Sequence, residues 1–101
     1  MVRNDRIRVL CVDDHPLVRD GIEFAIQQHS DLELVGEAAN GAEAIEAFRK
    51  FLPHVTLMDL QMPGMSGIDA MTAIRNEFPQ ARIVVLTTYS GDVLASRALK
   101  Q

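Results

Sequence analysis

Three short apolar runs of this sequence end in polar residues: two of them in aspartates and one in a threonine. Asp13 and Asp14 follow the first run, Asp59 ends the second, and Thr87 ends the third. Apolar runs of this length, rich in β-branched residues, predict strands. If the strands are parallel, their carboxyl ends meet at one edge of the sheet, which is where open α/β sheets bind their ligands. We therefore expect these four residues to share one crevice.

Three carboxylates that share a crevice point to a particular chemistry. Asp13, Asp14 and Asp59 could not all remain ionised at close range without a compensating cation. Mg²⁺ is the expected ion, because it binds one or two carboxylates and keeps several water ligands. Such a site would neutralise an incoming phosphoryl group, and attack by a carboxylate on phosphorus would give an acyl phosphate. The alternative is structural, since Asp also favours turns after strands.

The expected strands alternate with helices along the chain. The strand-like runs are Ile7–Val12, Leu32–Ala38, Val55–Asp59 and Arg82–Thr87. The second run alternates in part between apolar and polar residues, with Glu33 and Glu37 on one face, so we expect this strand nearer an edge of the sheet. Strand and helix that alternate four times predict a parallel sheet with helices on both faces.

Each expected helix has a start signal and an apolar face. Pro16 suits the first turn of the first helix. Asn40, with Glu43 three residues later, is typical of a capped start for the second helix, and Ser66 precedes the third. A last helix is expected after Ser90. The positions expected to face inward are Val18, Ile22, Ala25, Ile26, Ile45, Phe48, Leu52, Ile68, Met71, Ile74 and Phe78.

Length and composition indicate one small globular domain. The chain has 101 residues, of which 48% are apolar and 24% are charged. Its net charge of −4 argues against binding of a nucleic-acid backbone by this chain alone. Cys11 is the only cysteine, which excludes an internal disulfide and favours a reducing compartment, and so a cytoplasmic protein. Neither a signal peptide nor a stretch long enough to span a membrane is recognised.

Four segments in this order closely resemble the receiver domain of two-component response regulators, the CheY-like family. They are Val12–Arg19, Met58–Pro63, Met65–Gly67 and Val85–Thr87. Three segments are similar to the LuxR/NarL-FixJ-type subfamily, namely Asp13–Pro16, Glu37–Gly41 and Leu86–Tyr89. The resemblance implies that residues 1–101 form a doubly wound α/β receiver domain of flavodoxin-like order 2-1-3-4, with the fifth strand and fifth helix missing.

The resemblance implies roles for the residues at the strand ends. Asp59 would accept a phosphoryl group from a phosphohistidine on a sensor histidine kinase. Asp13 and Asp14, together with Asp59 and the backbone carbonyl of Gln61, would hold Mg²⁺. The chain would then be a phosphoacceptor signalling domain and not an enzyme, apart from phosphorylating and dephosphorylating itself.

The resemblance also implies a switch and an output. Thr87 would turn inward to bond the phosphoryl oxygens, and Tyr89 would move with it. Receivers carry a Lys at the end of a fifth strand, a position that Lys100 does not fill, so the receiver is expected to be incomplete at its C-terminus. A LuxR-type helix-turn-helix domain, absent from this chain, would bind DNA and regulate transcription. Without a fifth strand, the apolar run Ile83–Leu86 is expected to be an open edge through which the chain self-associates.

Several residues near these motifs receive a structural interpretation. His15 is expected to be an exposed residue of the first helical turn and not a ligand, because Mg²⁺ prefers oxygen. His29 and His54 are expected on the surface. Cys11 is expected to be a small core hydrophobe.

Two other functions are compatible with a strand-end Asp. Phosphatases of the haloacid-dehalogenase kind also use such an Asp as nucleophile with Mg²⁺. They require a second Asp two residues later, where this chain has Gln61. The other alternative is an interaction module that no longer accepts phosphate. Formation of an acyl phosphate would separate the module from the other two, and turnover of a small phosphate ester would identify the phosphatase.

Overall fold

In the part of the chain that the structure describes, four parallel strands form one sheet in the order β2-β1-β3-β4. The structure is a computed structural model, and it describes residues 5–86. The strands are β1 (Ile7–Val12), β2 (Leu32–Ala38), β3 (Val55–Asp59) and β4 (Ile83–Leu86). β1 pairs in parallel with β2 and β3, and β4 pairs in parallel with β3. The predicted order 2-1-3-4 is confirmed. The fourth strand was predicted one residue longer at each end, and its last residue, Thr87, lies outside the described residues.

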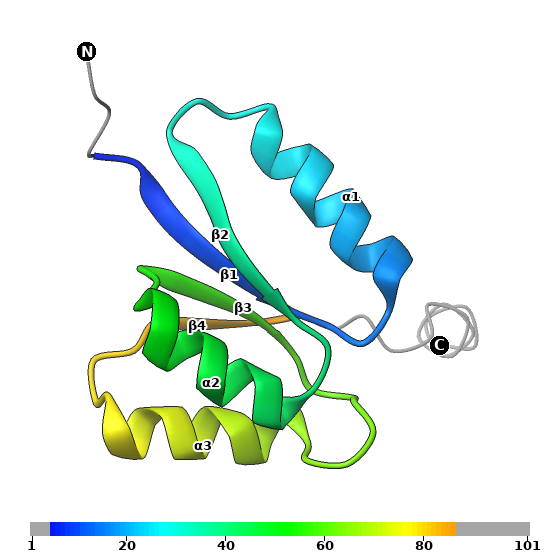
Figure 1. Cartoon of the computed structure of the whole chain (residues 1–101), viewed down its shortest axis with the longest axis vertical. Coiled ribbons are helices and arrows are strands. Elements are labelled where there is room, and N and C mark those ends of the chain that lie inside the picture. The colour runs from blue at the N-terminus through cyan, green and yellow to red at the C-terminus, as the bar shows by residue number, and fades with distance from the viewer. Residues whose placement is uncertain (1–4, 87–101) are drawn as a thin grey trace, which may run out of the picture.

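The described helices cover both faces of the sheet. They are α1 (Pro16–Gln27), α2 (Gly41–Phe51) and α3 (Gly67–Glu77). Figure 1 shows α1 on one side of the strands and the pair α2 and α3 on the other. The helix expected after Ser90 lies outside the described residues. Within residues 5–86, no helix has the length and apolar character needed to cross a membrane.

The predicted starts of α2 and α3 are held by side-chain caps. The Asn40 side chain accepts a hydrogen bond from the Glu43 N–H at 2.9 Å, and a Glu43 carboxylate oxygen accepts one from the Ala39 N–H at 2.9 Å. Ser66 accepts a hydrogen bond from the Asp69 N–H at 3.2 Å. Such caps satisfy N–H groups that have no partner inside the helix, so they fix where α2 and α3 begin.

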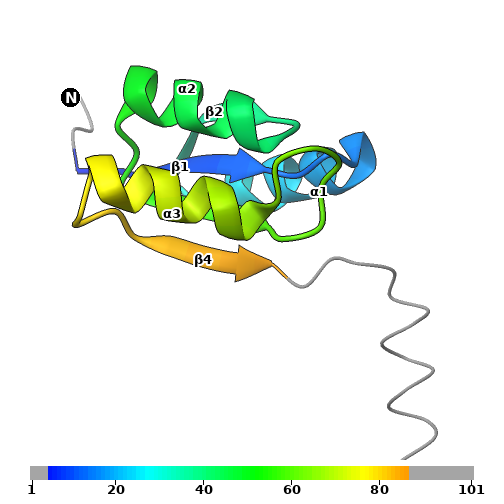
Figure 2. The same ribbon diagram turned by 90° about the horizontal axis from the view of Figure 1, so that it is seen from below.

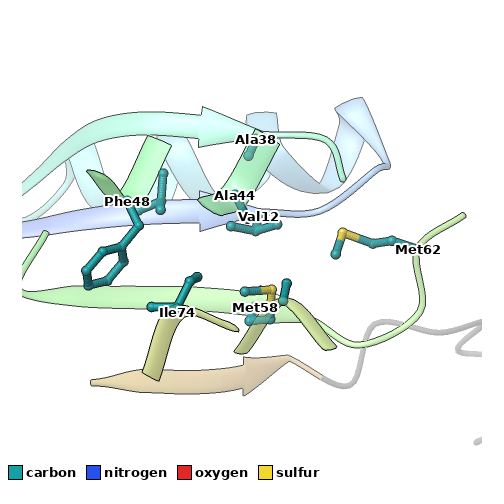
Figure 3. Close-up of a cluster of buried hydrophobic side chains, with 9 residues drawn as sticks. Val12, Ala38, Ala44, Phe48, Met58, Met62 and Ile74 are labelled. Atoms are coloured by element: carbon teal, nitrogen blue, oxygen red, sulfur yellow. The ribbon is translucent and has the colours of Figure 1, made fainter. Parts of the chain in front are cut away.

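Side chains of β1 alternate between two packed layers. Leu10 and Val12 belong to the core beneath α2 and α3, part of which Figure 3 shows. Val9 and Cys11 point to the opposite face, which α1 covers with Ile26. Burial of Cys11 raises the pKa of its thiol to about 12. Its predicted role as a core hydrophobe is therefore confirmed.

Three residues predicted to face inward are instead exposed. Leu52 follows the last residue of α2 and adopts a left-handed conformation with φ of 46°, which turns it out of the helical face. Ile68 follows the buried Gly67, so it is rotated by about 100° from the inward face of α3. Ala25 precedes the buried Ile26 on α1 and is rotated out in the same way.

The strand at each edge of the sheet has a different character. β2 carries the exposed Glu33 and Glu37, and its predicted place near a sheet edge is confirmed. β4 lies at the other edge, as Figure 2 shows. Its residues Val84 and Val85 have exposed fractions of 51% and 40%. Among the described strands, β4 therefore forms the apolar edge.

Candidate metal centre

The ends of two neighbouring strands bring the predicted carboxylates together. Val12 is paired with Met58 in the ladder between β1 and β3, so the next residues, Asp13 and Asp59, lie side by side at the edge of the sheet. Asp14 and His15 follow directly. One ligand atom from each of the following residues lies within 4.8 Å of all the others: Asp13, Asp14, His15 and Asp59. Thr87 and Tyr89, which were expected to join this crevice, lie outside the described residues.

Two of the carboxylates are buried. Asp13 has an exposed fraction of 0% and Asp59 of 1%. One oxygen of Asp59, Oδ1, accepts a hydrogen bond from the Gln61 N–H at 3.0 Å. Within residues 5–86, Oδ2 of Asp59 has no hydrogen-bond partner. A buried carboxylate that is not fully hydrogen-bonded is costly, and a hard cation held beside it would offset its charge.

The donor set fits Mg²⁺. Three carboxylates from two strand ends supply oxygen ligands, and the partly exposed Asp14 leaves one side of the site open to water. Gln61 lies two residues after Asp59 and its N–H group points to that carboxylate. Its backbone carbonyl remains a predicted ligand. The roles of Asp13, Asp14 and Asp59 as ligands likewise remain predictions that this geometry supports.

His15 contacts the carboxylates. This contact was not part of the prediction, which treated His15 only as an exposed residue of the first helical turn. Its side chain is 52% exposed, as predicted, but its ring nitrogen Nδ1 lies 2.7 Å from Asp13 Oδ1 and 3.1 Å from Asp14 Oδ1. The hydrogen bond with Asp13, followed by the charge of Asp14, raises the pKa of His15. The sequence signal for this contact is only that His15 follows Asp13 and Asp14 directly.

We expect the stability contributed by His15 to depend on pH in the metal-free protein. Because its pKa is raised in the folded state, this contribution is fully present below a pH of about 6.5 and is lost as the pH rises through the raised pKa. Melting curves in chelator should therefore show the His15→Asn variant less stable than the wild type at pH 5.5 and closer to it at pH 9. An equal difference at both pH values would contradict the assigned ion pairs.

Arg19 holds the turn that carries Asp13 and Asp14. Its Nη1 donates to the backbone carbonyl of Asp13 at 2.5 Å, and its Nε donates to Glu37 Oε1 at 3.1 Å. The guanidinium group therefore ties α1 to the end of β1 and to β2. Sequence reasoning missed this role, although an Arg in the first turns of α1 and a Glu near the end of the neighbouring strand are a signal for such a pair.

We expect Arg19→Met to weaken Mg²⁺ binding about tenfold, because residues that position metal ligands have effects of this size. Arg19→Lys should restore part of the affinity, since one donor can still reach the Asp13 carbonyl. Arg49→Met is the matched control, because Arg49 forms a two-pronged pair with Glu77 on α3. Calorimetric titration with Mg²⁺ measures all three. Equal losses in Arg19→Met and Arg49→Met would show that Arg19 has no specific link to the site.

The start of α3 lies so close to the end of β3 that its first residue must be a glycine. A Cβ atom on Gly67 would lie 2.2 Å from the backbone oxygen of Asp59 and 2.6 Å from the Cα of Leu60. Gly67 also donates its N–H to the Leu60 carbonyl at 3.2 Å. The first turn of α3 therefore rests directly on the strand end that carries Asp59. The sequence placed Gly67 at a helix start but gave no sign of this contact.

A cavity lies at the other end of the sheet, away from the carboxylates. It has a volume of about 950 Å³ and lies among the first residues of β1 and β3 and the last residues of α2 and α3. Leu52, Phe78 and Arg82 are among its lining residues, and none of the clustered carboxylates is. The candidate site is thus identified by its clustered carboxylates and not by the volume of a cavity.

His29 and His54 both lie on the surface, as predicted. Nδ1 of His54 accepts a hydrogen bond from the Arg8 N–H at 2.9 Å, which links the turn before β3 to β1. Neither residue belongs to the carboxylate cluster.

Comparison with known proteins agrees with this arrangement. The family model for the response regulator receiver domain matches residues 9–101. The transcriptional regulatory protein MctR of Rhizobium johnstonii is 44% identical over 89 residues, which cover 88% of this chain and 42% of MctR. The chain thus spans about two fifths of the length of that relative.

Solved structures show the same likeness. A two-component response regulator of the LuxR family from Aurantimonas sp. superposes with a TM-score of 0.79 at 37% identity, covering 94% of this chain and 68% of that one. The response regulator protein TrrA of Thermotoga maritima, in complex with Mg(2+)-BeF, has a TM-score of 0.75 at 34% identity, covering 83% of this chain and 71% of TrrA. With the matched family model, the sheet order and the clustered carboxylates, these likenesses show that the chain belongs to the response regulator receiver domain family.

Proposed function

We propose that this receiver domain accepts a phosphoryl group on Asp59 in a Mg²⁺-dependent reaction, from a phosphohistidine of a sensor histidine kinase. The observation that carries the proposal is the buried Asp59, whose Oδ2 has no hydrogen-bond partner within residues 5–86 and faces the ring and carboxylates after β1. Asp13, Asp14, Asp59 and the backbone carbonyl of Gln61 would hold the ion. Mg²⁺ would supply positive charge to offset that of the carboxylates and the phosphoryl oxygens.

The hydrogen bonds of Asp59 favour one oxygen as the nucleophile. Oδ1 is held by the Gln61 N–H, so Oδ2 is the oxygen left to attack phosphorus. A new bond would form between Oδ2 and phosphorus while the bond between phosphorus and the histidine nitrogen of the kinase breaks. The product is an acyl phosphate on Asp59 and a free histidine on the kinase. The buried, tightly packed strand end would hold the nucleophile in place during this transfer.

The relatives support both the ion and the output. TrrA was solved in complex with Mg(2+)-BeF, and MctR is named a transcriptional regulatory protein. We infer that phosphorylation of this receiver shifts Thr87, with Tyr89, and that the shift is read by a LuxR-type helix-turn-helix domain that binds DNA. Switching of this kind requires a contact that differs between the two states, and Thr87 is the predicted contact.

The proposal is tested by adding a small acyl phosphate donor, such as acetyl phosphate, to the protein with and without Mg²⁺. Intact-mass spectrometry should show the addition of one phosphoryl group with Mg²⁺ present and none in chelator. Release of phosphate from p-nitrophenyl phosphate at a steady catalytic rate would instead identify a phosphatase. Absence of any phosphoryl addition under both conditions would refute the proposal.

We also propose that the 101-residue chain self-associates through β4. Val84 and Val85 are exposed on a strand that pairs with β3 alone among the described strands, and such edges pair with other chains. Val84→Lys should therefore lower the mass measured by light scattering to that of a monomer. Leu17→Lys is the matched control, because it adds the same charge at an exposed apolar position on α1. A wild-type chain that is monomeric over a wide concentration range would refute this interaction.

A further inference from the structure

The cavity at the starts of β1 and β3 has the size and lining of a small-molecule pocket. Its volume of about 950 Å³ falls within the range of about 300–1,000 Å³ that is typical of such pockets. Most of its lining residues are apolar, and a few are charged. Figure 3 shows Phe48, one of the lining residues, at the end of the core that lies away from the arrowheads of the strands. The cavity is therefore separate from the carboxylates that follow β1 and β3.

Aromatic and aliphatic side chains form much of this lining. The rings of Phe48 and Phe78 have centroids 4.9 Å apart and are tilted by 43° to each other. Ile7 and Leu52 also line the cavity, and they are 41% and 54% exposed. Large apolar side chains that are exposed together beside a cavity indicate a surface that a ligand covers.

The backbone at Leu52 is strained in a way that brings its side chain to the cavity. Leu52 has a φ of 46°, a left-handed conformation that is unfavourable for leucine. Two hydrogen bonds hold it there: the Leu52 N–H donates to the Phe48 carbonyl at 2.8 Å, and the Leu52 carbonyl accepts from Arg8 Nη1 at 3.0 Å. Strain of this kind is often retained at binding sites.

Two guanidinium groups of the lining have no partner for their charge. The Nε atom of Arg6 is buried and makes no hydrogen bond within residues 5–86. The exposed side chain of Arg82 forms neither an ion pair nor a hydrogen bond among the same residues. Arg6 also borders a smaller cavity, but that one is mainly polar and is lined by Glu23 and Glu33. An anion would therefore meet both guanidinium groups in the apolar cavity.

The acidic groups around the apolar cavity are already engaged. Glu77 forms a two-pronged pair with Arg49, with its shortest contact at 2.9 Å, and Asp5 has an interaction of its own. The carbonyl ends of α2 and α3 carry partial negative charge, and basic residues in their last turns offset it, namely Arg49, Lys50 and Arg75. Among the described residues, the uncompensated charge at the cavity is thus positive, although the whole chain carries −4.

We propose that this cavity binds a small organic carboxylate with an aromatic body. The ring system packs against the apolar lining, and the carboxylate accepts hydrogen bonds from Arg6 and Arg82. Arginine suits this role because its donors match the two oxygens of a carboxylate. A highly charged ligand such as a nucleotide is disfavoured, because most of the lining is apolar. The inference does not depend on phosphoryl transfer at Asp59, which lies at the opposite end of β3.

The probe is 2-naphthoate, and 2-naphthalenemethanol, which has the same rings and no charge, is its matched control. Calorimetric titration of the wild type at neutral pH measures both affinities. We expect 2-naphthoate to bind at one site per chain and about tenfold or more tightly than the alcohol, because hydrogen bonds to charged groups are the stronger ones. Saturating 2-naphthoate should also raise the Tm, since a ligand that binds only the folded chain stabilises it.

Three variants locate the site, and a fourth is the control. Arg6→Gln and Arg82→Gln should each weaken 2-naphthoate binding about fivefold or more. Leu52→Gly removes apolar lining and suits the left-handed backbone, so it should weaken the binding of both probes without lowering the Tm. Arg75→Gln removes the same charge from α3 outside the lining, and its affinity should stay within about twofold of the wild type.

Several outcomes would overturn this inference. They are no saturable binding of 2-naphthoate by the wild type, equal affinity for the alcohol, unchanged affinity in both cavity arginine variants, and an equal loss in Arg75→Gln. Affinity that falls as the protein concentration rises would also overturn it, because a second copy of the chain would then cover the cavity. Melting curves without ligand show that each variant is folded, and the exposed Arg82 keeps the test decisive if Arg6→Gln is unstable.

Discussion

Asp59→Asn is expected to abolish phosphoryl uptake from acetyl phosphate, with no addition detected by intact-mass spectrometry at a donor concentration that saturates the wild type. An amide does not attack phosphorus as a carboxylate does, and residues 60–66, which join β3 to α3, contain no other carboxylate. The variant should remain folded. Its Oδ1 can still accept the hydrogen bond of Gln61, and its new N–H₂ group can donate toward the neighbouring carboxylates.

The same substitution should raise the stability of the metal-free protein. Asp59 is a buried carboxylate crowded by Asp13 and Asp14, and its Oδ2 has no hydrogen-bond partner within residues 5–86, so a neutral amide in its place should add about 1 to 2 kcal/mol to the free energy of unfolding. Asp20→Asn, on the exposed surface of α1, is the matched control and should change neither uptake nor stability. Uptake by Asp59→Asn at the wild-type stoichiometry would show that another residue is the acceptor.

Gly67→Ala is expected to be the most destabilising glycine-to-alanine substitution in the described part of the chain. The added Cβ would lie 2.2 Å from the Asp59 carbonyl oxygen and 2.6 Å from the Leu60 Cα, both backbone atoms that cannot rotate away. Overpacking of this severity costs about 3 kcal/mol or more, which corresponds to a fall in Tm of about 12 °C or more for a chain of this size. Because the strand end must move, Mg²⁺ affinity should fall as well.

Gly21→Ala is the control for the glycine substitution itself. Gly21 lies within α1, and an added Cβ would meet no atom within 4 Å. Alanine in a helix is favoured over glycine by about 1 kcal/mol, so this variant should be slightly more stable than the wild type. Thermal melts of both variants provide the measurement. A Gly67→Ala variant with the Tm of the wild type would contradict the close packing of α3 on the Asp59 strand end.

The arrangement of strands and helices could be predicted because it rests on local patterns. Apolar runs gave the four strands, and side-chain caps such as Asn40 and Ser66 gave the helix starts. The incorrect predictions concern residues whose burial depends on where a helix ends or on how the helix is rotated about its axis. Leu52 continues the apolar spacing of α2, but the helix has ended and the backbone has turned to a positive φ. Pro53, one residue later, predicts the end but not the direction of the turn.

The candidate site was predictable to the extent that topology determines it. Parallel pairing of β1 and β3 places Asp13 beside Asp59, and that pairing follows from the order of elements. The contacts of His15 and Arg19 could not be predicted, because they depend on the backbone path of the turn after β1. The tight contact at Gly67 depends on the angle at which α3 meets the strand end. The roles of Thr87 and Tyr89 lie outside the described residues and remain predictions.

The most direct test of the proposed function is to map the phosphoryl group on the wild-type protein. The chain is phosphorylated with acetyl phosphate and Mg²⁺, reduced with borohydride, which converts an acyl phosphate on aspartate to homoserine, and digested for tandem mass spectrometry. We predict homoserine at position 59 alone, and none when chelator replaces Mg²⁺. Homoserine at position 13 or 14, or a phosphoryl group on His15 with position 59 unmodified, would contradict the assignment of Asp59 as the phosphoacceptor.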